Sequence, residues 1–238
     1  VQGQPPRYKA RFVAKGFSQR AGVDFTETYF SVVTHDALRL LMSCVAAEDM
    51  EMVQVDIKTA VLYGSLQEEI YMTQPEDFVI PERETEVCQL HKGIYGLKQS
   101  SYVWCKRFTD FIKKHGFKQS EEDPCLLLRI NGMEKNFLVI YVDDGIIASN
   151  QQSFIDEFLA VLGAEFQIRS HPIERFVGIS INHDRKKKIH LSQPDYTAEV
   201  VEKYRMTNCF QRRFRPTQAL VWRSQNQRKP YYFHTGKQ

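Results

Sequence analysis

Six apolar residues in a row lead directly into two adjacent acids, and this feature constrains the chain most. Residues 137–142 are followed by Asp143, Asp144 and Gly145, and a second apolar run begins after the glycine. The apolar flanks predict two buried strands, and the glycine favours a tight hairpin with the acids at its tip. Two neighbouring carboxylates repel each other and are costly to desolvate. A divalent cation would resolve both problems, although Asp and Gly are also the residues that ordinary solvated turns prefer.

A third acid stands near the end of another apolar segment. Residues 52–57 place Val53, Val55 and Ile57 on one face of a predicted strand, and Asp56 follows Val55 in that segment. Three carboxylates at strand ends provide the oxygen donors that two Mg²⁺ ions require. Paired ions can activate an attacking hydroxyl and stabilise a leaving oxygen. Together these acids favour in-line phosphoryl transfer as the chemistry.

The remaining pattern predicts an α+β domain with a largely antiparallel sheet and helices on one face. One helix is expected where Asp36 can serve as its cap, and another where Trp104, Phe108, Phe111 and Ile112 recur at helical spacing. Further strands are predicted at 8–14, 68–72 and 125–130, a helix at 154–166, a hairpin from 175–182 and 188–191, and a last helix that Ser192, Pro194 and Asp195 open.

Composition limits the class of protein. A chain of 238 residues is long enough for one large domain or two closely packed subdomains. The five cysteines are scattered, which favours reduced thiols over disulfides or zinc, and no apolar run could span a membrane. From Lys203 onward the sequence is basic without any acid, and we expect residues 210–238 to be a degenerate, poorly ordered tail after a folded region at 1–209. The chain also begins without Met, as a fragment of a longer reading frame would.

Several motifs together resemble copia-type retrotransposon reverse transcriptases. The stretch from Tyr141 to Asp144 is similar to the Y-x-D-D signature of reverse transcriptases. The order of the other matching segments fits the copia branch, and the resemblance covers roughly residues 7–209. These segments are residues 8–19 (fingers strand), 54–60 (first catalytic motif), 69–75, 94–99 with Trp104 (nucleotide-binding motif), 116–120, 123–125, 176–179 and 191–193.

The resemblance implies an RNA-directed DNA polymerase with a palm-and-fingers fold and the start of a thumb. Its partners would be an RNA or DNA template with a primer and deoxynucleoside triphosphates, without a membrane, and a dimer is left open. Its cofactor would be two Mg²⁺ ions, with Mn²⁺ as an alternative. The family likeness alone suggests a cytoplasmic location, with the nucleus as the alternative.

Residue roles follow position by position from the same resemblance. Asp56, Asp143 and Asp144 would be the catalytic and metal-binding acids, with the Ile57 carbonyl as a further metal ligand. The nucleotide-binding residues would be Lys9, Arg11, Val61, Tyr95 and Gly96, and the hairpin that grips the primer would be Phe176, Val177 and Gly178. Lys9 and Arg11 could also be a solvated strand face, and the hairpin residues could simply pack in a sheet.

Departures from the family pattern keep a second function open. Val61 stands where the family usually has Phe, which predicts weaker rejection of ribonucleotides. Ser100-Ser101 and the segment from Ser170 to Pro172 also differ from the usual residues, while all three acids are intact. The alternatives are therefore an active polymerase and a catalytically inactive relic or domesticated nucleic-acid-binding module. A metal-dependent nuclease or cyclase would share the acids but would not explain the segments at 8–19 and 94–99.

Overall fold

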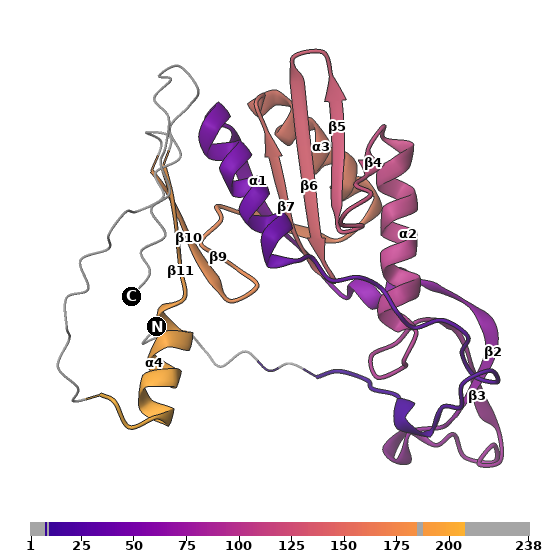
Figure 1. The fold of residues 1–238 in the computed structure, drawn as a ribbon. Coiled ribbons are helices and arrows are strands. Elements are labelled where there is room, and N and C mark those ends of the chain that lie inside the picture. The colour runs from indigo at the N-terminus through magenta and orange to yellow at the C-terminus, as the bar shows by residue number, and fades with distance from the viewer. Residues whose placement is uncertain (1–7, 9, 185–187, 208–238) are drawn as a thin grey trace, which may run out of the picture. The chain divides into compact units, whose positions relative to one another are not determined.

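Six antiparallel strands form the central sheet, in the order β4-β5-β6-β7-β1-β8. The computed structural model describes residue 8, residues 10–184 and residues 188–207, and the chain divides into two compact units, residues 1–191 and 192–238. The sheet belongs to the first unit (Figure 1). Its strands are β1 (Glu51–Ile57), β4 (Lys118–Gln119), β5 (Leu126–Asn131), β6 (Glu134–Tyr141), β7 (Asp144–Ser149) and β8 (Ile168–His171).

The predicted hairpin of apolar strands forms the centre of this sheet. β6 and β7 pair so that Tyr141 lies opposite Asp144, and β1 pairs with β7 so that Asp56 also lies opposite Asp144. Four consecutive residues of β6, from Phe137 to Ile140, are buried. Because successive side chains of a strand point to opposite faces, this burial means that both faces of the sheet are covered.

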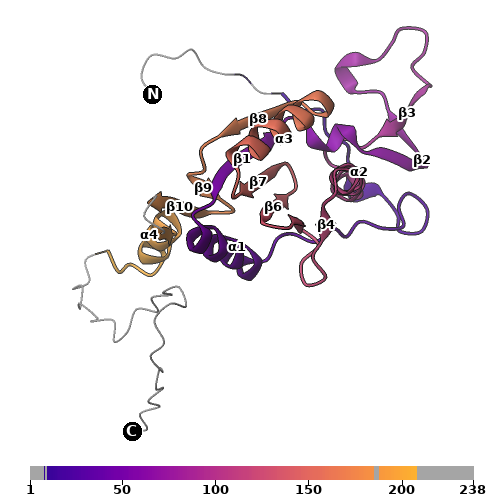
Figure 2. The same cartoon turned by 90° about the horizontal axis from the view of Figure 1, so that it is seen from above.

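Helices lie on both sides of the sheet, so the prediction of helices on one face is wrong. Figures 1 and 2 show α1 (His35–Glu48) on one side and α3 (Gln152–Glu165) on the other. α2 (Ser100–Lys114) shares an aromatic cluster with the end of α3. The continuous apolar runs of β6 and β7 are the physical reason, because a strand that is apolar on both faces needs a cover on each.

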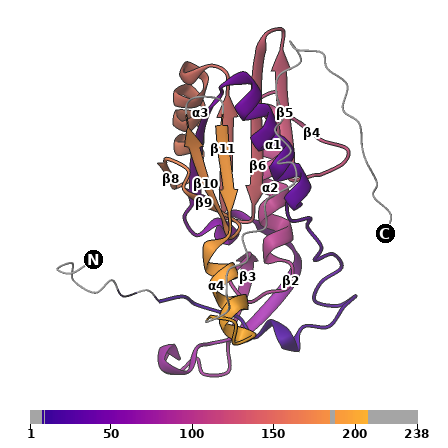
Figure 3. The ribbon, with the colours of Figure 1, turned by 60° about the vertical axis from the view of Figure 1, so that its left-hand side comes forward.

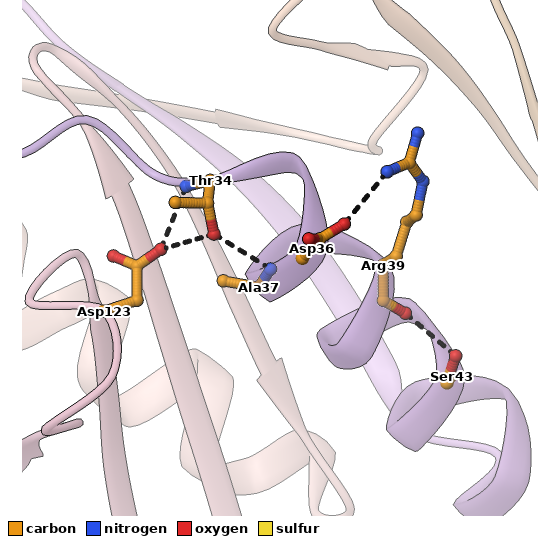
Figure 4. A network of polar contacts seen from close by, with 6 residues as sticks. All are labelled: Thr34, Asp36, Ala37, Arg39, Ser43 and Asp123. Carbon is orange, nitrogen blue, oxygen red and sulfur yellow. Dashed lines mark hydrogen bonds and ion pairs between the residues drawn. The ribbon is translucent and has the colours of Figure 1, made fainter.

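Thr34, and not Asp36, caps α1. The Thr34 hydroxyl accepts a hydrogen bond from the Ala37 amide at 3.1 Å, as Figure 4 shows. Asp36 lies within the first turn of α1 and pairs with Arg39. The buried Asp123 carboxylate accepts hydrogen bonds from both the amide and the hydroxyl of Thr34 at 2.9 Å. The start of α1 is therefore fastened to the loop before β5.

The aromatic residues predicted on one helical face do enter the core. Trp104, Phe108 and Ile112 of α2 are buried, and Phe111 is half-buried against them. Phe166, at the end of α3, lies 5.4 Å from Trp104 and 5.7 Å from Phe108 between ring centroids. These contacts hold α2 and α3 together on the same side of the sheet.

Two smaller sheets flank the central one within the first unit. β2 (Ser65–Thr73) pairs with β3 (Val87–Lys92), and β9 (Arg175–Phe176), β10 (Ile179–Asp184) and β11 (Lys188–Ser192) form the third sheet, which is visible in Figure 3. The predicted strand at 68–72 and the predicted pairing of two strands around 185–187 are confirmed, but the first of them, predicted at 175–182, is broken by a turn at 177–178 into β9 and β10. The turn at residues 185–187 lies outside the described residues.

The N-terminal segment is not the strand that its alternating pattern predicts. Over the described residues from 10 to 14, only Val13 forms a bridge, to Tyr95, and Gly16–Ser18 forms a short 3-10 helix, η1. Tyr95, the bridge partner of Val13, lies in a loop, so the bridge does not extend into a pair of strands on either side. Two further 3-10 helices are η2 (Ala60–Tyr63) and η3 (Glu76–Phe78).

The second unit contributes one described helix, α4 (Pro194–Lys203). Pro194 occupies its first turn, where a missing N–H is harmless, as the sequence predicts. None of its residues is buried within the described part of the chain. The predicted basic tail, residues 210–238, lies outside the described residues. Among the helices that can be described, none has the length and apolar character that crossing a membrane requires.

Candidate active site

Three strands of the central sheet bring the three predicted acids to the same end. The register places Asp56 of β1 opposite Asp144 of β7, and Asp143 lies in the turn just before β7. The Ile57 amide donates a hydrogen bond to the Asp143 carbonyl at 2.8 Å. Asp143 is exposed, whereas Asp56 and Asp144 are half-buried. The hairpin predicted from the apolar runs is therefore present, and its acids meet the acid of the third strand.

The turn between β6 and β7 takes its shape from a valine. Val142 adopts a φ of 55°, in the left-handed region that non-glycine residues rarely enter. Gly145 was predicted to allow the tight turn, but it lies within β7 and has no positive φ. A Cβ there would approach the Val139 carbonyl oxygen to 3.2 Å, so the glycine serves close strand packing instead.

The acids act on one another electrostatically. The pKa of Asp144 is raised, first because burial penalises its charged form and then because Asp143 and Asp56 repel its charge. A hydrogen bond from Gln54 and the nearby His171 oppose this rise. Asp144 is therefore the acid whose charged form is disfavoured by its burial and its two acidic neighbours. An added cation would favour ionisation of Asp144.

A pocket of about 620 Å³ opens beside these acids. Asp56, Ile57 and Asp143 line one part of it, and Arg11 and Tyr95 line another. Arg11 lies over the Tyr95 ring, with 5.5 Å between the guanidinium carbon and the ring centroid. The Ala14 amide donates to the Tyr95 carbonyl at 2.7 Å, which holds the N-terminal segment against this loop. Residues from two distant parts of the sequence thus meet at the carboxylates.

Some predicted nucleotide-binding residues lie elsewhere. Val61 of η2 is buried and does not line the pocket, whereas the adjacent Leu62 does. Gly96 also does not line it; a Cβ at this position, where φ is 93°, would come within 2.1 Å of the Ala14 carbonyl oxygen. Glycine at this position therefore allows close contact with the backbone at Ala14. Lys9 lies outside the described residues.

The predicted primer-grip residues form a separate hairpin. Phe176 pairs with Ile179, which leaves Val177 and Gly178 as the two turn residues, with φ values of 46° and 74°. Phe176 is buried, and a Cβ added to Gly178 would meet nothing within 4 Å. None of the three residues lines the pocket beside the acids.

Sequence reasoning missed two cations that line the pocket, Lys58 and Arg169. Lys58 directly follows the strand of Asp56, and Arg169 of β8 lies opposite Asp56 in the sheet. Lys58 lies within the matching segment at 54–60, which gave a signal, whereas only the pairing of β1 with β8 could identify Arg169. A pocket with acids on one wall and cations around it suits a phosphorylated ligand with a bound metal.

The donor set fits a divalent cation in chemistry, since three carboxylates lie at the same end of the sheet. Within the part of the chain that the structure describes, however, no group of three or more His, Cys, Asp or Glu side chains is already arranged to hold a metal ion. A second pocket, of about 580 Å³, lies between residues 12–24 and the β2–β3 ribbon and contains none of the three acids.

Comparison with known proteins places these residues in a family. Residues 2–218 match the model of the family described as reverse transcriptase (RNA-dependent DNA polymerase). The chain is 38% identical over 206 residues to the retrovirus-related Pol polyprotein from transposon TNT 1-94 of Nicotiana tabacum, covering 85% of this chain and 15% of that polyprotein. It is 34% identical over 205 residues to the Pol polyprotein from transposon RE2 of Arabidopsis thaliana, covering 86% of this chain and 14% of that one.

The chain thus spans about a seventh of the curated relatives that it matches. No solved structure matches it. The family match extends over most of the chain and includes all three acids of the site. The chain therefore belongs to the copia-type reverse transcriptases, as a reverse transcriptase domain of the kind found in the Pol polyproteins of transposons.

Proposed function

We propose that this chain extends a primer on an RNA or DNA template by adding deoxynucleotides at the pocket beside Asp56 and Asp143. The observation that carries the proposal is that this pocket joins the acids to Arg11 and Tyr95, which come from separate segments of the chain. An incoming triphosphate needs both cations and a metal-binding acid within reach, and this pocket offers both.

In this proposal, Asp56, Asp143 and the Ile57 carbonyl hold the metal, and Asp144 completes the acidic cluster. The chemistry expected with two Mg²⁺ ions bound, or Mn²⁺ in their place, is activation of the primer hydroxyl and stabilisation of the leaving oxygen. Arg11, Lys58 and Arg169 neutralise the triphosphate from the pocket walls. Tyr95, held under Arg11, offers a ring face against which the nucleotide can lie.

The finer fold assignment belongs to the same proposal. The central sheet with α1, α2 and α3 would be the palm, and the N-terminal segment with the β2–β3 ribbon would be the fingers. The turn of Val177 and Gly178 would contact the primer end, and α4 would begin the thumb. A dimer and a cytoplasmic location, with the nucleus as the alternative, remain expectations from the family.

Sugar selection is proposed to be weak. Val61 replaces the larger Phe of the family, and because it does not line the pocket itself, its smaller side chain would leave more room for a ribose 2′-hydroxyl only through the adjacent Leu62. Leu62, which is 38% exposed and lines the pocket, is then the residue next to Val61 that is available for discrimination. Replacing either residue with Phe should increase the preference for deoxynucleotides, and the position with the larger increase would be the one that faces the sugar.

The test is primer extension on an RNA template with Mg²⁺, comparing the parent chain with an Asp143→Asn, Asp144→Asn double variant. An Asp110→Asn variant is the matched control, because Asp110 is an exposed acid of α2. Extension by the parent and the control but not by the double variant would support the proposal. A folded parent that binds primer and template without extending them would instead favour the relic or domesticated binding module.

A further inference from the structure

The indole of Trp104 contacts the turn that carries the acids. Its Nε1–H donates a hydrogen bond to the carbonyl of Val142 at 2.7 Å. Trp104 belongs to α2, and Val142 is the residue directly before Asp143. The contact therefore joins a helix to the one residue of the acidic turn that has a positive φ. A bond at this place restrains the orientation of the peptide unit between Val142 and Asp143.

The valine makes such a restraint necessary. Non-glycine residues in the left-handed region are strained, and they persist only where the surrounding structure fixes them. A turn with a positive φ at its first central residue is the kind that normally has glycine there. Without an external partner for its carbonyl, the Val142 peptide would gain by rotating away, and the Asp143 side chain would rotate with it.

The indole itself is held rigidly. Trp104 has no exposed surface, and the rings of Tyr63, Phe108 and Phe166 surround it at centroid distances of 5.9, 5.3 and 5.4 Å. A Cβ on Gly64 would come within 2.7 Å of the Trp104 amide nitrogen, so the helix backbone is also closely packed. A buried donor in fixed surroundings defines a single position for the carbonyl that it binds.

The same aromatic cluster is also connected with the end of the strand that carries Asp56. The Tyr63 hydroxyl accepts a hydrogen bond from the Gln167 amide at 2.9 Å, and the Gln167 carbonyl accepts one from the Lys58 amide at 2.8 Å. Lys58 lines the pocket beside Asp56. Packing around Trp104 is thus connected with both the turn of Asp143 and the strand end of Asp56.

We propose that Trp104 is a positioning residue, whose indole N–H holds the strained Val142 peptide so that Asp143 keeps the orientation that nucleotide transfer needs. The inference rests on the proposed polymerase function for its kinetic consequence. Small displacements of a reacting group cost large factors in rate, while substrate affinity depends on other contacts. Loss of the indole bond should therefore lower kcat and leave the KM for the nucleotide nearly unchanged.

The decisive variants are Trp104→Phe, Val142→Gly and the two combined. Trp104→Phe keeps a ring in the cluster but removes the donor, and kcat should fall about tenfold to a hundredfold. Val142→Gly removes the strain, so it should restore about fivefold of kcat in the Trp104→Phe background and change the parent by less than about threefold. If Val142→Gly raises kcat only when Trp104 is absent, the two residues are coupled, and the function of the indole bond is to hold the strained Val142 peptide.

Phe166→Leu serves as the matched control for packing. It removes a ring from the same cluster and leaves the indole donor in place, so it should lower the melting temperature while kcat stays within about threefold of the parent. An unchanged kcat in Trp104→Phe, no recovery with Val142→Gly, or an equal loss of kcat in Phe166→Leu would each overturn the proposal.

Hydrogen exchange separates this proposal from the proposed function. The sequence has two tryptophans, and the signal that disappears in Trp104→Phe identifies the Trp104 indole in a nitrogen-labelled sample. We expect slow exchange of that N–H in the parent and exchange no faster in Val142→Gly, because glycine adopts the positive φ without strain and the bonded conformation is kept. A parent that exchanges slowly but does not extend primers would overturn polymerase activity and leave the indole hydrogen bond established. Rapid exchange in the parent would overturn the restraint, whatever the activity.

Discussion

Two hairpins of this molecule each have a valine with a positive φ in the turn, but different contacts stabilise the two turns. The β6–β7 turn has Val142 at a φ of 55°, and the β9–β10 turn has Val177 at a φ of 46°. The first turn is fixed at its tip, because Trp104 and Ile57 donate hydrogen bonds to the carbonyls of Val142 and Asp143. The second is fixed at its base, because Phe176 and Ile179 are buried while the tip at Gly178 is open.

The difference indicates what each turn can tolerate. A turn held at its tip has a defined orientation for the side chain it carries, which catalysis by Asp143 would require. A turn held at its base keeps its place in the sheet but leaves the tip free to adapt to a ligand. Strained backbone is therefore no sign of catalysis by itself, and the partners of the turn carbonyls distinguish the two cases.

The largest difference in kcat between the two hairpins is expected when Asp143 and Val177 are each replaced with asparagine. Asp143→Asn removes the charge and keeps the shape, so the rate of primer extension should fall by at least about a thousandfold with no loss of stability. Val177→Asn introduces a residue that tolerates a positive φ, and kcat should stay within about threefold while the KM for the primer changes. Steady-state kinetics with varied primer would measure both. A thousandfold loss of kcat in Val177→Asn would end the contrast between the hairpins.

A smaller effect, on stability, is expected at the base of the second hairpin. Phe176 is 1% exposed, and replacing it with Ala should cost about 3–5 kcal/mol in the free energy of unfolding. Denaturant unfolding would measure this cost. The exposed Tyr71 of β2 provides a reference, because its replacement with Ala should cost less than about 1 kcal/mol. Similar costs at both sites would mean that burial at the base does not hold this hairpin.

The parts of the fold that the sequence predicts well are those with a strong local pattern. The apolar runs on either side of Asp143 and Asp144 predict the central hairpin, and the alternation before Asp56 predicts its neighbouring strand. The four residues at helical spacing in α2 predict its buried face. In each case the pattern repeats over several residues, so that no distant contact is needed to interpret it.

The parts that it predicts poorly depend on contacts between distant residues. Asp36 is a good helix cap by type, but Asp123, which lies 89 positions from Thr34, fixes the start of α1 at Thr34 instead. The glycine beside the acids suggests a tight turn, yet Val142 adopts the positive φ because Trp104 binds its carbonyl. Arg169 reaches the site only through the pairing of β8 with β1. Local preference gives no information on any of these three contacts.

The smallest effect is expected when each strained valine becomes glycine. Glycine relieves about 1 kcal/mol of left-handed strain, but it also adds about 0.4–1 kcal/mol of chain entropy to the unfolded state. Val142→Gly and Val177→Gly should therefore each change the free energy of unfolding by less than about 0.5 kcal/mol. By contrast, Val55→Gly, at a buried position of β1, should cost more than about 2 kcal/mol. A cost near that of Val55→Gly at position 142 alone would show that the valine side chain, and not only its backbone, contributes to the acidic turn. The restraint would then act through packing as well as through the indole hydrogen bond.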